Sequence, residues 1–385
     1  MAVTVSNPIH FLLDKLVAFQ SVSSHSNLDL IGFVQDYLSE HGISSTRIVG
    51  ADPQKANLWA SIGPPAEGGI VLSGHSDVVP AEGQLWQSPP FRLLEREGRL
   101  YGRGTCDMKG FLACAIHTIT AQDTANLDRP VHLCLTHDEE TDCSGIKAVV
   151  AQMGKSLPRP DVAIVGEPTA MNVVSGHKGV REFKVRVLGK SAHGSMPQSG
   201  VNAISLGARA IARLDEIGLR LAAGASQNPR FTPPHTTLNI GMARGGTASN
   251  IIPDRFTFIG DIRAIPQDDP DQLQTEFETW IRRELLPSVG RNAQEASIGI
   301  DVICDIPPFH PQIDSAAERL VRGLTGDMEE RVVAFGSEAG ILQAAGVASV
   351  LIGPGSMEQG HTADEYVDVA QLEACRHFLR RLLNT

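Results

Sequence analysis

Carboxylate and imidazole side chains follow several apolar segments of this 385-residue chain. The densest group is Asp138-Glu139-Glu140, which comes shortly after the apolar residues 131–135. Neighbouring carboxylates at the end of a buried strand repel one another and are costly to remove from water. Two interpretations follow. The group is either an acidic loop tip in water, or a metal site in which one glutamate is a ligand and its neighbour transfers protons.

Comparable side chains occur at four other places. They are His75 and Asp77 after residues 70–72, Asp107 in a glycine-flanked turn, Glu167 after residues 161–165, and His361 after residues 347–352. Two imidazoles and three carboxylates suffice to hold two divalent cations, with one carboxylate bridging them. Asp77, two residues after His75, is placed to fix the imidazole tautomer without binding the metal itself.

Each candidate also has an ordinary structural explanation. His75 and His361 could be hydrogen-bonded histidines of the core or of a loop. Asp107 could be a helix N-cap, and Glu167 could belong to a turn that ends a strand. The metal interpretation is favoured because ligand sites of open α/β sheets lie at the carboxyl ends of the strands, where these residues are expected to converge.

The elements that would position these residues alternate between strand and helix. Predicted strands are residues 57–62, 70–72, 131–135, 161–165 and 347–352, and predicted helices begin at Asn7-Pro8 and cover 28–41, 108–120, 144–153, a stretch from Asp314, and 369–383. Short, mostly apolar strands separated by helices indicate an α/β fold with a mostly parallel sheet. Asp368 and Gln371 have the spacing of a capping pair for the last helix.

The pattern changes near Gly179. Residues 182–188 alternate strictly between apolar and polar side chains, which is typical of a half-exposed antiparallel strand. The elements that follow are a helix at 202–217, strands at 236–242 and 255–263, a helix at 271–286 and a strand at 297–304. This β-α-β-β-α-β order predicts an inserted ferredoxin-like α+β domain. We expect a first domain formed by residues 1–179 and 309–385, and an inserted domain at 180–308.

Composition excludes several classes of partner. The formal net charge is −11, and the absence of a basic run disfavours nucleic acid and membrane surfaces. No apolar stretch is long enough to span a membrane. Residues 1–8 lack the features of a signal peptide, and the six cysteines show no C-x-x-C spacing. We therefore expect reduced thiols and a cytoplasmic protein.

Three segments carry a family resemblance. They are Ser73-Gly74-His75-Ser76-Asp77-Val78-Val79-Pro80, Gly102-Arg103-Gly104-Thr105-Cys106-Asp107-Met108-Lys109-Gly110 and Thr136-His137-Asp138-Glu139-Glu140. Together they resemble the aminoacylase/carboxypeptidase superfamily of di-zinc hydrolases, and the resemblance runs essentially from end to end. It implies a zinc-hydrolase catalytic domain with the inserted domain described above.

The resemblance also implies a role for each candidate. One Zn²⁺ would be bound by His75, Asp107 and Glu167, and a second by Asp107, Glu140 and His361. Glu139 would be the general base, Asp77 would orient His75, and the Asp107-Met108 peptide would be cis. Co²⁺ or Mn²⁺ could replace zinc, because the same nitrogen and oxygen ligands accept them.

These roles define an amide hydrolysis. A water molecule between two cations loses a proton near neutral pH, and the resulting hydroxide attacks the amide carbonyl. Glu139 accepts that proton and passes it to the leaving amine. The oxyanion needs further donors. In the superfamily one is a histidine that reaches across from the partner subunit, and it matches His193, so we expect a homodimer formed through the inserted domain.

The resemblance implies that the substrate is a small N-acyl amino acid. Asn250 and Arg263 match the superfamily's carboxylate-binding positions, and arginine suits a bidentate carboxylate contact. Residues 26–31, 336–340, 353–356 and 364–366 resemble the subgroup that hydrolyses N2-acetyl-L-ornithine to L-ornithine and acetate in arginine biosynthesis. Desuccinylases of the superfamily carry Asp-Gly-Arg where this chain has Glu338-Ala339-Gly340, so Glu338 could instead face a basic amine.

Alternatives with the same machinery are another N-acyl-amino-acid deacylase, a succinyl-diaminopimelate desuccinylase and a dipeptidase. A non-catalytic metal-binding protein is a different class, and the presence of Glu139 beside a full ligand set argues against it. A serine or cysteine hydrolase is disfavoured, since no G-x-S-x-G elbow occurs and Cys106 beside Asp107 is poorly placed for a lowered pKa.

Overall fold

The computed structural model describes residues 7–122, 127–224, 226–312 and 314–384. The chain divides into two compact units. Unit 1 contains Met1–Gly176, His310–Val332 and Ser337–Thr385, and unit 2 contains His177–Phe309 and Val333–Gly336. Residues 1–6, on which part of the signal-peptide expectation depends, lie outside the described residues.

Unit 1 is built on a six-stranded sheet. Its strands, in spatial order, are β1 (Ser45–Val49), β2 (Ala56–Ile62), β6 (Val131–Thr136), β3 (Ile70–His75), β7 (Val162–Val165) and β16 (Ala348–Leu351). The strands from β6 to β16 run parallel, whereas β1 and β2 are antiparallel to their neighbours. The predicted α/β fold with a mostly parallel sheet is confirmed.

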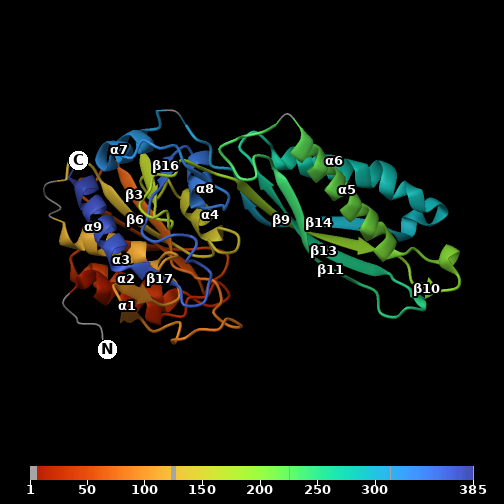
Figure 1. Cartoon of the computed structure of the whole chain (residues 1–385), viewed down its shortest axis with the longest axis horizontal. Coiled ribbons are helices and arrows are strands. Elements are labelled where there is room, and N and C mark those ends of the chain that lie inside the picture. The colour runs from red at the N-terminus through yellow and green to blue at the C-terminus, as the bar shows by residue number, and fades with distance from the viewer. Residues whose placement is uncertain (1–6, 123–126, 225, 313, 385) are drawn as a thin grey trace. The chain divides into compact units, whose positions relative to one another are not determined.

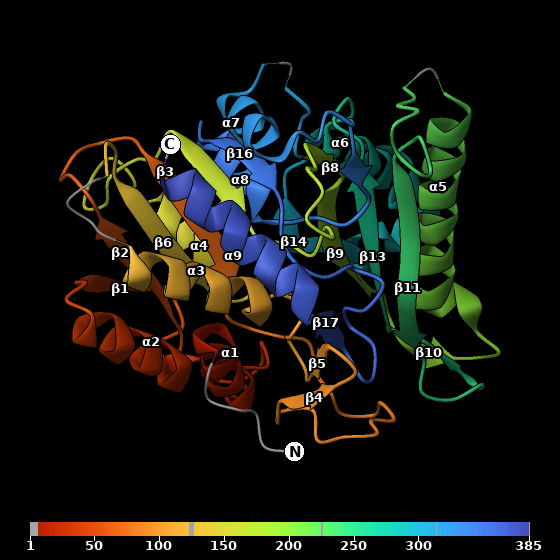
Figure 2. The same cartoon turned by 60° about the vertical axis from the view of Figure 1, so that its left-hand side comes forward.

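Helices flank this sheet. They are α1 (Pro8–Ala18), α2 (Leu28–Glu40), α3 (Lys109–Ala121), α4 (Ser144–Val150), α7 (Ala316–Thr325), α8 (Glu338–Ala344) and α9 (Val369–Leu383). Helix α3 packs against α1 and α9, and α4 packs against α8; Figure 2 shows α3 and α9 across the front of the sheet. Every residue of β3, β6 and β7 is buried, which explains why these strands are mostly apolar until β3 and β6 reach their carboxyl ends.

Helix ends depend on particular side chains. Asn7 caps α1 as expected, because its side chain accepts a hydrogen bond from the amide of Ile9 at 3.0 Å. The predicted capping pair at α9 is wrong. Asp368 also ends strand β17 (Tyr366–Asp368), and its carboxylate accepts instead from Arg99 Nε of β5 (Arg99–Tyr101) at 3.1 Å. Gln371 Oε1 is buried with no hydrogen-bond partner in the described part of the chain.

Two helix boundaries differ from the prediction. Helix α7 begins at Ala316 rather than Asp314, because Asp314 has a φ of 62°, in the left-handed region. Helix α4 ends at Val150 rather than at residue 153, because the carbonyl of Gln152 accepts amides from the turn that follows.

Unit 2 has the predicted β-α-β-β-α-β order. Its elements are β9 (Gly179–Leu188), α5 (Ala203–Ala223), β11 (Thr237–Gly245), β13 (Arg255–Ala264), α6 (Pro270–Trp280) and β14 (Ser297–Ile306). The strands form an antiparallel sheet in the order β11-β13-β9-β14, with both helices on one face (Figure 1). This is the ferredoxin-like arrangement. The helix predicted at 271–286 instead changes to a π-helical segment at Ile281–Leu285.

The remaining elements are short. They are β4 (Leu94–Arg96), β8 (Gly176–His177), β10 (Ala192–His193), β12 (Ile251–Ile252), β15 (Val332–Val333) and 3-10 helices at Pro197–Ser199 and Pro287–Glu295. Within the described ranges, no helix is both long and apolar enough to cross a membrane.

Candidate metal centre

The carboxyl ends of three parallel strands meet at one edge of the unit 1 sheet. His75 at the end of β3 is in register with Thr136 at the end of β6, and Ser73 is in register with Val165 at the end of β7. The residues that follow these strands include Glu139, Glu140 and Glu167. Parallel pairing therefore brings together side chains that are far apart in the sequence.

Asp107 lies between the two imidazoles. Its Oδ1 is 3.1 Å from His75 Nε2, and its Oδ2 is 3.3 Å from His361 Nε2. His361 Nε2 is also 3.0 Å from Glu140 Oε1. A carboxylate that faces one imidazole with each oxygen has the arrangement of a ligand that bridges two cations.

Two overlapping groups of possible ligand atoms converge here. One contains His75, Asp107 and Glu140, the other His75, Glu139 and Glu167, and within each group the atoms lie within 4.8 Å of one another. Glu167 Oε1 is buried and has no hydrogen-bond partner among the residues that the structure describes. A buried carboxylate oxygen without a donor is what a bound divalent cation would satisfy, so the cluster fits a metal.

The pKa values of the glutamates reflect their crowding. Burial raises the pKa of Glu139 and of Glu167 well above the usual range, and repulsion from neighbouring carboxylates raises both further. Burial and the charge of Asp107 raise the pKa of Glu140 to about 7. The three glutamates cannot all ionise easily unless positive charge lies between them.

The pKa values of the two imidazoles are raised as well, whereas that of Asp107 is lowered. Burial lowers the pKa of His75, but the hydrogen bond to Asp107 raises it well above 6.5. Hydrogen bonds to Asp107 and Glu140 raise the pKa of His361 to about 10. Burial raises the pKa of Asp107, but its hydrogen bonds to the two histidines hold it below the usual range. The cluster therefore binds protons with which a metal ion must compete.

Asp77 contacts the cluster through both its main chain and its side chain. His75 Nδ1 is 2.9 Å from the Asp77 carbonyl oxygen, whereas the nearest carboxylate oxygen is 3.7 Å away. That carboxylate accepts from Ser23 Oγ at 2.6 Å and from the amides of Glu139 and Glu140, each at 3.3 Å. Asp77 is thus placed to orient His75 with its carbonyl and the two glutamates with its carboxylate.

Glu365 is a site residue that the sequence did not identify. Its carboxylate is 1% exposed and accepts from the amides of Gly104, Cys106 and Asp107 at 2.9–3.0 Å, and from Arg103 Nη1 at 2.7 Å. It thereby holds the turn that carries Asp107. The sequence signal that could have indicated Glu365 was Arg103 between two glycines, since a buried arginine requires an acidic partner.

The peptide bond between Asp107 and Met108 is cis, as the family resemblance implied. Met108 then precedes α3, whose first residue is Lys109.

Glu338 lies inside unit 1, at the first residue of α8. It is 1% exposed, and its carboxylate accepts from Ser73 Oγ of β3 at 3.0 Å and from Thr136 Oγ1 of β6. Burial raises its pKa. Its position at the carboxyl ends of β3 and β6 places a further carboxyl group beside the cluster, where its charge contributes to the raised pKa of Glu167.

The other candidates for substrate contact belong to unit 2. His193 is exposed on β10, with Nδ1 2.7 Å from Ser195 Oγ. The amide of Gly194 donates to the carbonyl of Asn250 at 2.7 Å, so His193 and Asn250 are neighbours. Arg263 donates from Nε to Asp261 at 2.9 Å, near the far end of β13. Unit 2 therefore brings His193 and Asn250 together but separates them from Arg263.

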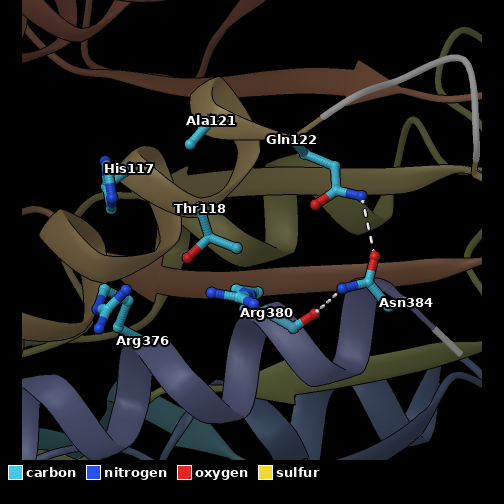
Figure 3. A pocket seen from close by; sticks show the side chains of 7 residues that line it. All are labelled: His117, Thr118, Ala121, Gln122, Arg376, Arg380 and Asn384. Carbon is cyan, nitrogen blue, oxygen red and sulfur yellow. Dashed lines mark hydrogen bonds between the residues drawn. The ribbon is translucent and has the colours of Figure 1, made fainter.

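A cavity of about 310 Å³ lies away from this cluster, between α3 and α9 (Figure 3). It is lined by His117, Thr118, Ala121, Gln122, Arg376, Arg380 and Asn384. None of the candidate residues contributes to it.

The chain is similar to known proteins over nearly its full length. An acetylornithine deacetylase from Myxococcus xanthus is 36% identical over 374 residues, covering 96% of this chain and 95% of that protein. One from Proteus mirabilis (strain HI4320) is 34% identical over 380 residues, covering 97% and 95%.

The fold is shared with solved structures. An M20 family metallo-carboxypeptidase from Sulfolobus solfataricus superposes with a TM-score of 0.77 at 16% identity, covering 98% of this chain and 99% of that one. A dinuclear metal-binding M20 peptidase from Bacillus subtilis superposes with a TM-score of 0.63 at 16% identity, covering 98% and 96%. The family model of peptidase family M20/M25/M40 matches residues 71–385. The chain is a metal-dependent hydrolase and belongs to the M20/M25/M40 peptidase family.

Proposed function

We propose that this enzyme removes the acetyl group from N2-acetyl-L-ornithine, giving L-ornithine and acetate, as a step of arginine biosynthesis. The observation that carries the proposal is the converging cluster of His75, Asp107, Glu140 and Glu167 with Glu139 among them. The near-full-length similarity to acetylornithine deacetylases supports this choice of amide.

We assign two Zn²⁺ ions to the cluster, with Co²⁺ as a possible substitute. The proposed ligands are His75, Asp107 and Glu167 for one ion, and Asp107, Glu140 and His361 for the other. Asp107 facing both imidazoles supports the bridging role. Bound cations of this kind lower the pKa of a water molecule and polarise an amide carbonyl.

Glu139 is the proposed general base and acid. It removes the proton from the attacking water and delivers it to the nitrogen of the leaving amine. Burial and the neighbouring carboxylates raise the pKa of Glu139, so it holds a proton more readily than an exposed glutamate does, which suits a group that must accept one. Asp77 assists by holding both the imidazole of His75 and the amide of Glu139.

Recognition of the substrate carboxylate is assigned to Asn250 and Arg263, and stabilisation of the oxyanion to His193. Asn250 and Arg263 are separated by most of β13. The eight residue-to-residue steps of strand from Arg255 to Arg263 span about 26 Å at roughly 3.3 Å per step. One carboxylate cannot reach both in the same chain.

This separation supports a homodimer in which His193 and Asn250 reach the site of the partner subunit. The exposed edge strand β11 of the unit 2 sheet offers a surface for pairing, and unit 2 would then act as a lid and dimerisation domain. A solution mass of one chain at micromolar concentration would contradict the dimer.

Glu338 is proposed to favour a substrate with a basic side chain, such as ornithine. Its carboxylate adds negative charge beside the cluster, and its present donors are neutral hydroxyl groups. The test compares kcat/KM of Glu338→Gln on N-acetyl-L-ornithine and on N-acetyl-L-methionine. A larger loss on acetylornithine supports the assignment, and an equal loss on both removes it.

The experiment that tests the function measures hydrolysis of acetylornithine, succinyl-diaminopimelate and a dipeptide side by side. Acetylornithine should be turned over fastest, chelation should abolish turnover, and Zn²⁺ or Co²⁺ should restore it. If succinyl-diaminopimelate or the dipeptide is hydrolysed faster, that compound replaces acetylornithine as the proposed substrate. We place the enzyme in the cytoplasm, since its six cysteines are buried and show no C-x-x-C spacing.

A further inference from the structure

Lys55 links the segment containing Ser23 to the turn that carries Glu139 and Glu140. It precedes β2, and its Nζ donates to the carbonyl of Ser23 at 2.5 Å and to the carboxylate of Asp138. The side chains of Lys55 and Asp138 are 12% and 11% exposed. A largely buried ammonium group with two acceptors is a fixed connection rather than a mobile surface contact.

Asp138 organises the turn that carries Glu139 and Glu140. It has a φ of 58°, and its carbonyl oxygen accepts from the amides of residues 141, 142 and 143 at 2.7–3.3 Å. Its other carboxylate oxygen contacts His137 Nδ1 at 3.0 Å and accepts from Ser144 Oγ at 3.3 Å. These bonds fix the turn to Asp138, so the position of Asp138 determines the position of the adjacent Glu139.

Ser23 provides the second half of the connection. Its carbonyl accepts from Lys55, and its hydroxyl donates to Asp77, which in turn accepts from the amides of Glu139 and Glu140. The loop containing Ser23 thus reaches the glutamate pair through Asp77 and bonds Lys55 directly. These hydrogen bonds form a closed ring from Lys55 through Ser23 and Asp77 to the glutamate turn and back through Asp138.

We propose that Lys55 is a positioning residue for the general base: its ammonium group joins Ser23 to Asp138 and so fixes the turn that presents Glu139 to the substrate. The inference rests on the proposed function, because it assumes that Glu139 transfers protons. Lys55 does not touch the ligand cluster through any of its hydrogen bonds. Its loss should misplace the base, and a displacement of about 1 Å in a catalytic group costs up to roughly 100-fold in rate.

The chain offers a matched control. Lys147 also donates to the turn, from Nζ to the carbonyl of Asp142 at 2.8 Å, but this contact is exposed. Lys55→Met and Lys147→Met each remove one ammonium group that bonds the same turn while keeping most of the aliphatic side chain. Lys55→Arg keeps the charge and a donor.

We expect Lys55→Met to lower kcat by about 10- to 100-fold while KM changes by less than about threefold and the metal content per chain stays at the wild-type value. Lys55→Arg should recover part of kcat, and Lys147→Met should match the wild type. A loss that appears in KM or in metal content rather than in kcat would overturn the inference, as would an equal loss in Lys147→Met.

A double-mutant cycle provides the decisive readout. In a Glu139→Gln background, Lys55→Met should cause no further fall in the single-turnover rate, because the group that it positions is already gone. An undiminished loss in that background would mean that Lys55 acts on general stability. If Lys55→Met does not fold, the same cycle is run with Lys55→Arg. The smaller fall in rate that Lys55→Arg causes in the wild type should also be absent in the Glu139→Gln background.

The two proposals fail in different ways. The cycle is run with whichever amide substrate the wild type hydrolyses fastest, so a wrong substrate changes the assay compound but not the coupling. If Glu139→Gln retains the wild-type rate, the proposed base is wrong, and the role of Lys55 is overturned with it. If Glu139→Gln is inactive and the cycle is additive, only the role of Lys55 is overturned.

Discussion

Two turns of unit 1 carry candidate ligands, and they are held in different ways. The turn containing Asp107 is fixed by Glu365, which accepts three amides at 2.9–3.0 Å and pairs with Arg103, both side chains being 1% exposed. The turn containing Glu139 and Glu140 is held by Asp77 through two amides at 3.3 Å, and by Asp138 and Lys55, which are slightly more exposed.

The difference agrees with the work assigned to each turn. Asp107 is proposed to bridge two ions and has to remain in one place. Glu139 is proposed to carry a proton from water to the amine, so its side chain must reach two positions during one turnover. Three amides and an arginine on one buried carboxylate suit the first task, whereas the second turn is held at its main chain, at Asp138 and at Lys55, which leaves the Glu139 side chain able to move.

The largest effect is expected from Glu139→Gln, which removes the proton carrier and leaves the shape of its turn. Turnover of acetylornithine should fall by about 10²–10⁴-fold, the usual contribution of a general acid-base group. Metal content, measured by mass spectrometry of the digested protein, should equal that of the wild type. Near-normal turnover would show that the second turn does not carry the base.

Arg103→Met tests the more rigid turn. It leaves Glu365 buried without its cation, and breaking a buried ion pair costs about 3–5 kcal/mol. We expect the free energy of unfolding of Arg103→Met, measured by urea titration, to be clearly lower than that of the wild type. Adding Glu365→Gln should recover part of it, because the orphaned charge is then removed. Equal stability of Arg103→Met and the wild type would remove the claimed difference between the turns.

The metal-free protein should be less stable at high pH. The pKa of Glu140 is raised to about 7 and that of His361 to about 10, so the folded state binds protons more tightly than the unfolded chain. This stability is complete below the unfolded values near 4.5 and 6.5, and is lost as pH rises through the folded values. Tm of the chelated protein should fall by several degrees between about pH 5 and pH 9.

Saturating Zn²⁺ supplies the matched comparison, because a bound cation replaces these protons and should flatten the dependence. A Tm of the chelated protein that rises steadily over the same range would contradict the assigned shifts.

The smallest effect is expected from Ser23→Ala. It removes the hydroxyl that donates to Asp77 but leaves the carbonyl that accepts from Lys55. Loss of one hydrogen bond to a charged group costs about 1.5–3 kcal/mol at most, and the amides of the glutamates remain on Asp77. We expect kcat to fall by roughly tenfold or less. A loss as large as that of Glu139→Gln would mean that the second turn is as rigid as the first.

Much of this arrangement could be predicted from the sequence. Apolar runs locate β3, β6 and β7, and the rule that ligands gather at strand carboxyl ends predicts that His75, Glu140 and Glu167 meet at one edge of the sheet. The ferredoxin-like order was equally clear from the change in periodicity after Gly179. These features follow from local patterns of hydrophobicity.

The supporting residues could not be predicted in the same way. Glu365 contacts Asp107 across 258 positions, and Lys55 contacts Asp138 across 83, with no periodicity to mark either pair. The capping pair at α9 failed for a similar reason: Arg99, distant in sequence, competes for Asp368. Side-chain bonds between remote segments depend on the finished fold.

The length of β13 has a genetic consequence. With Asn250 and His193 at one end of unit 2 and Arg263 at the other, the proposed active site is composed of residues from two chains. Two alleles, each inactive alone, should then complement one another. A heterodimer of a Glu139→Gln chain with a His193→Ala chain would contain one site with both defects and one with neither, so mixing two dead enzymes should restore part of the activity.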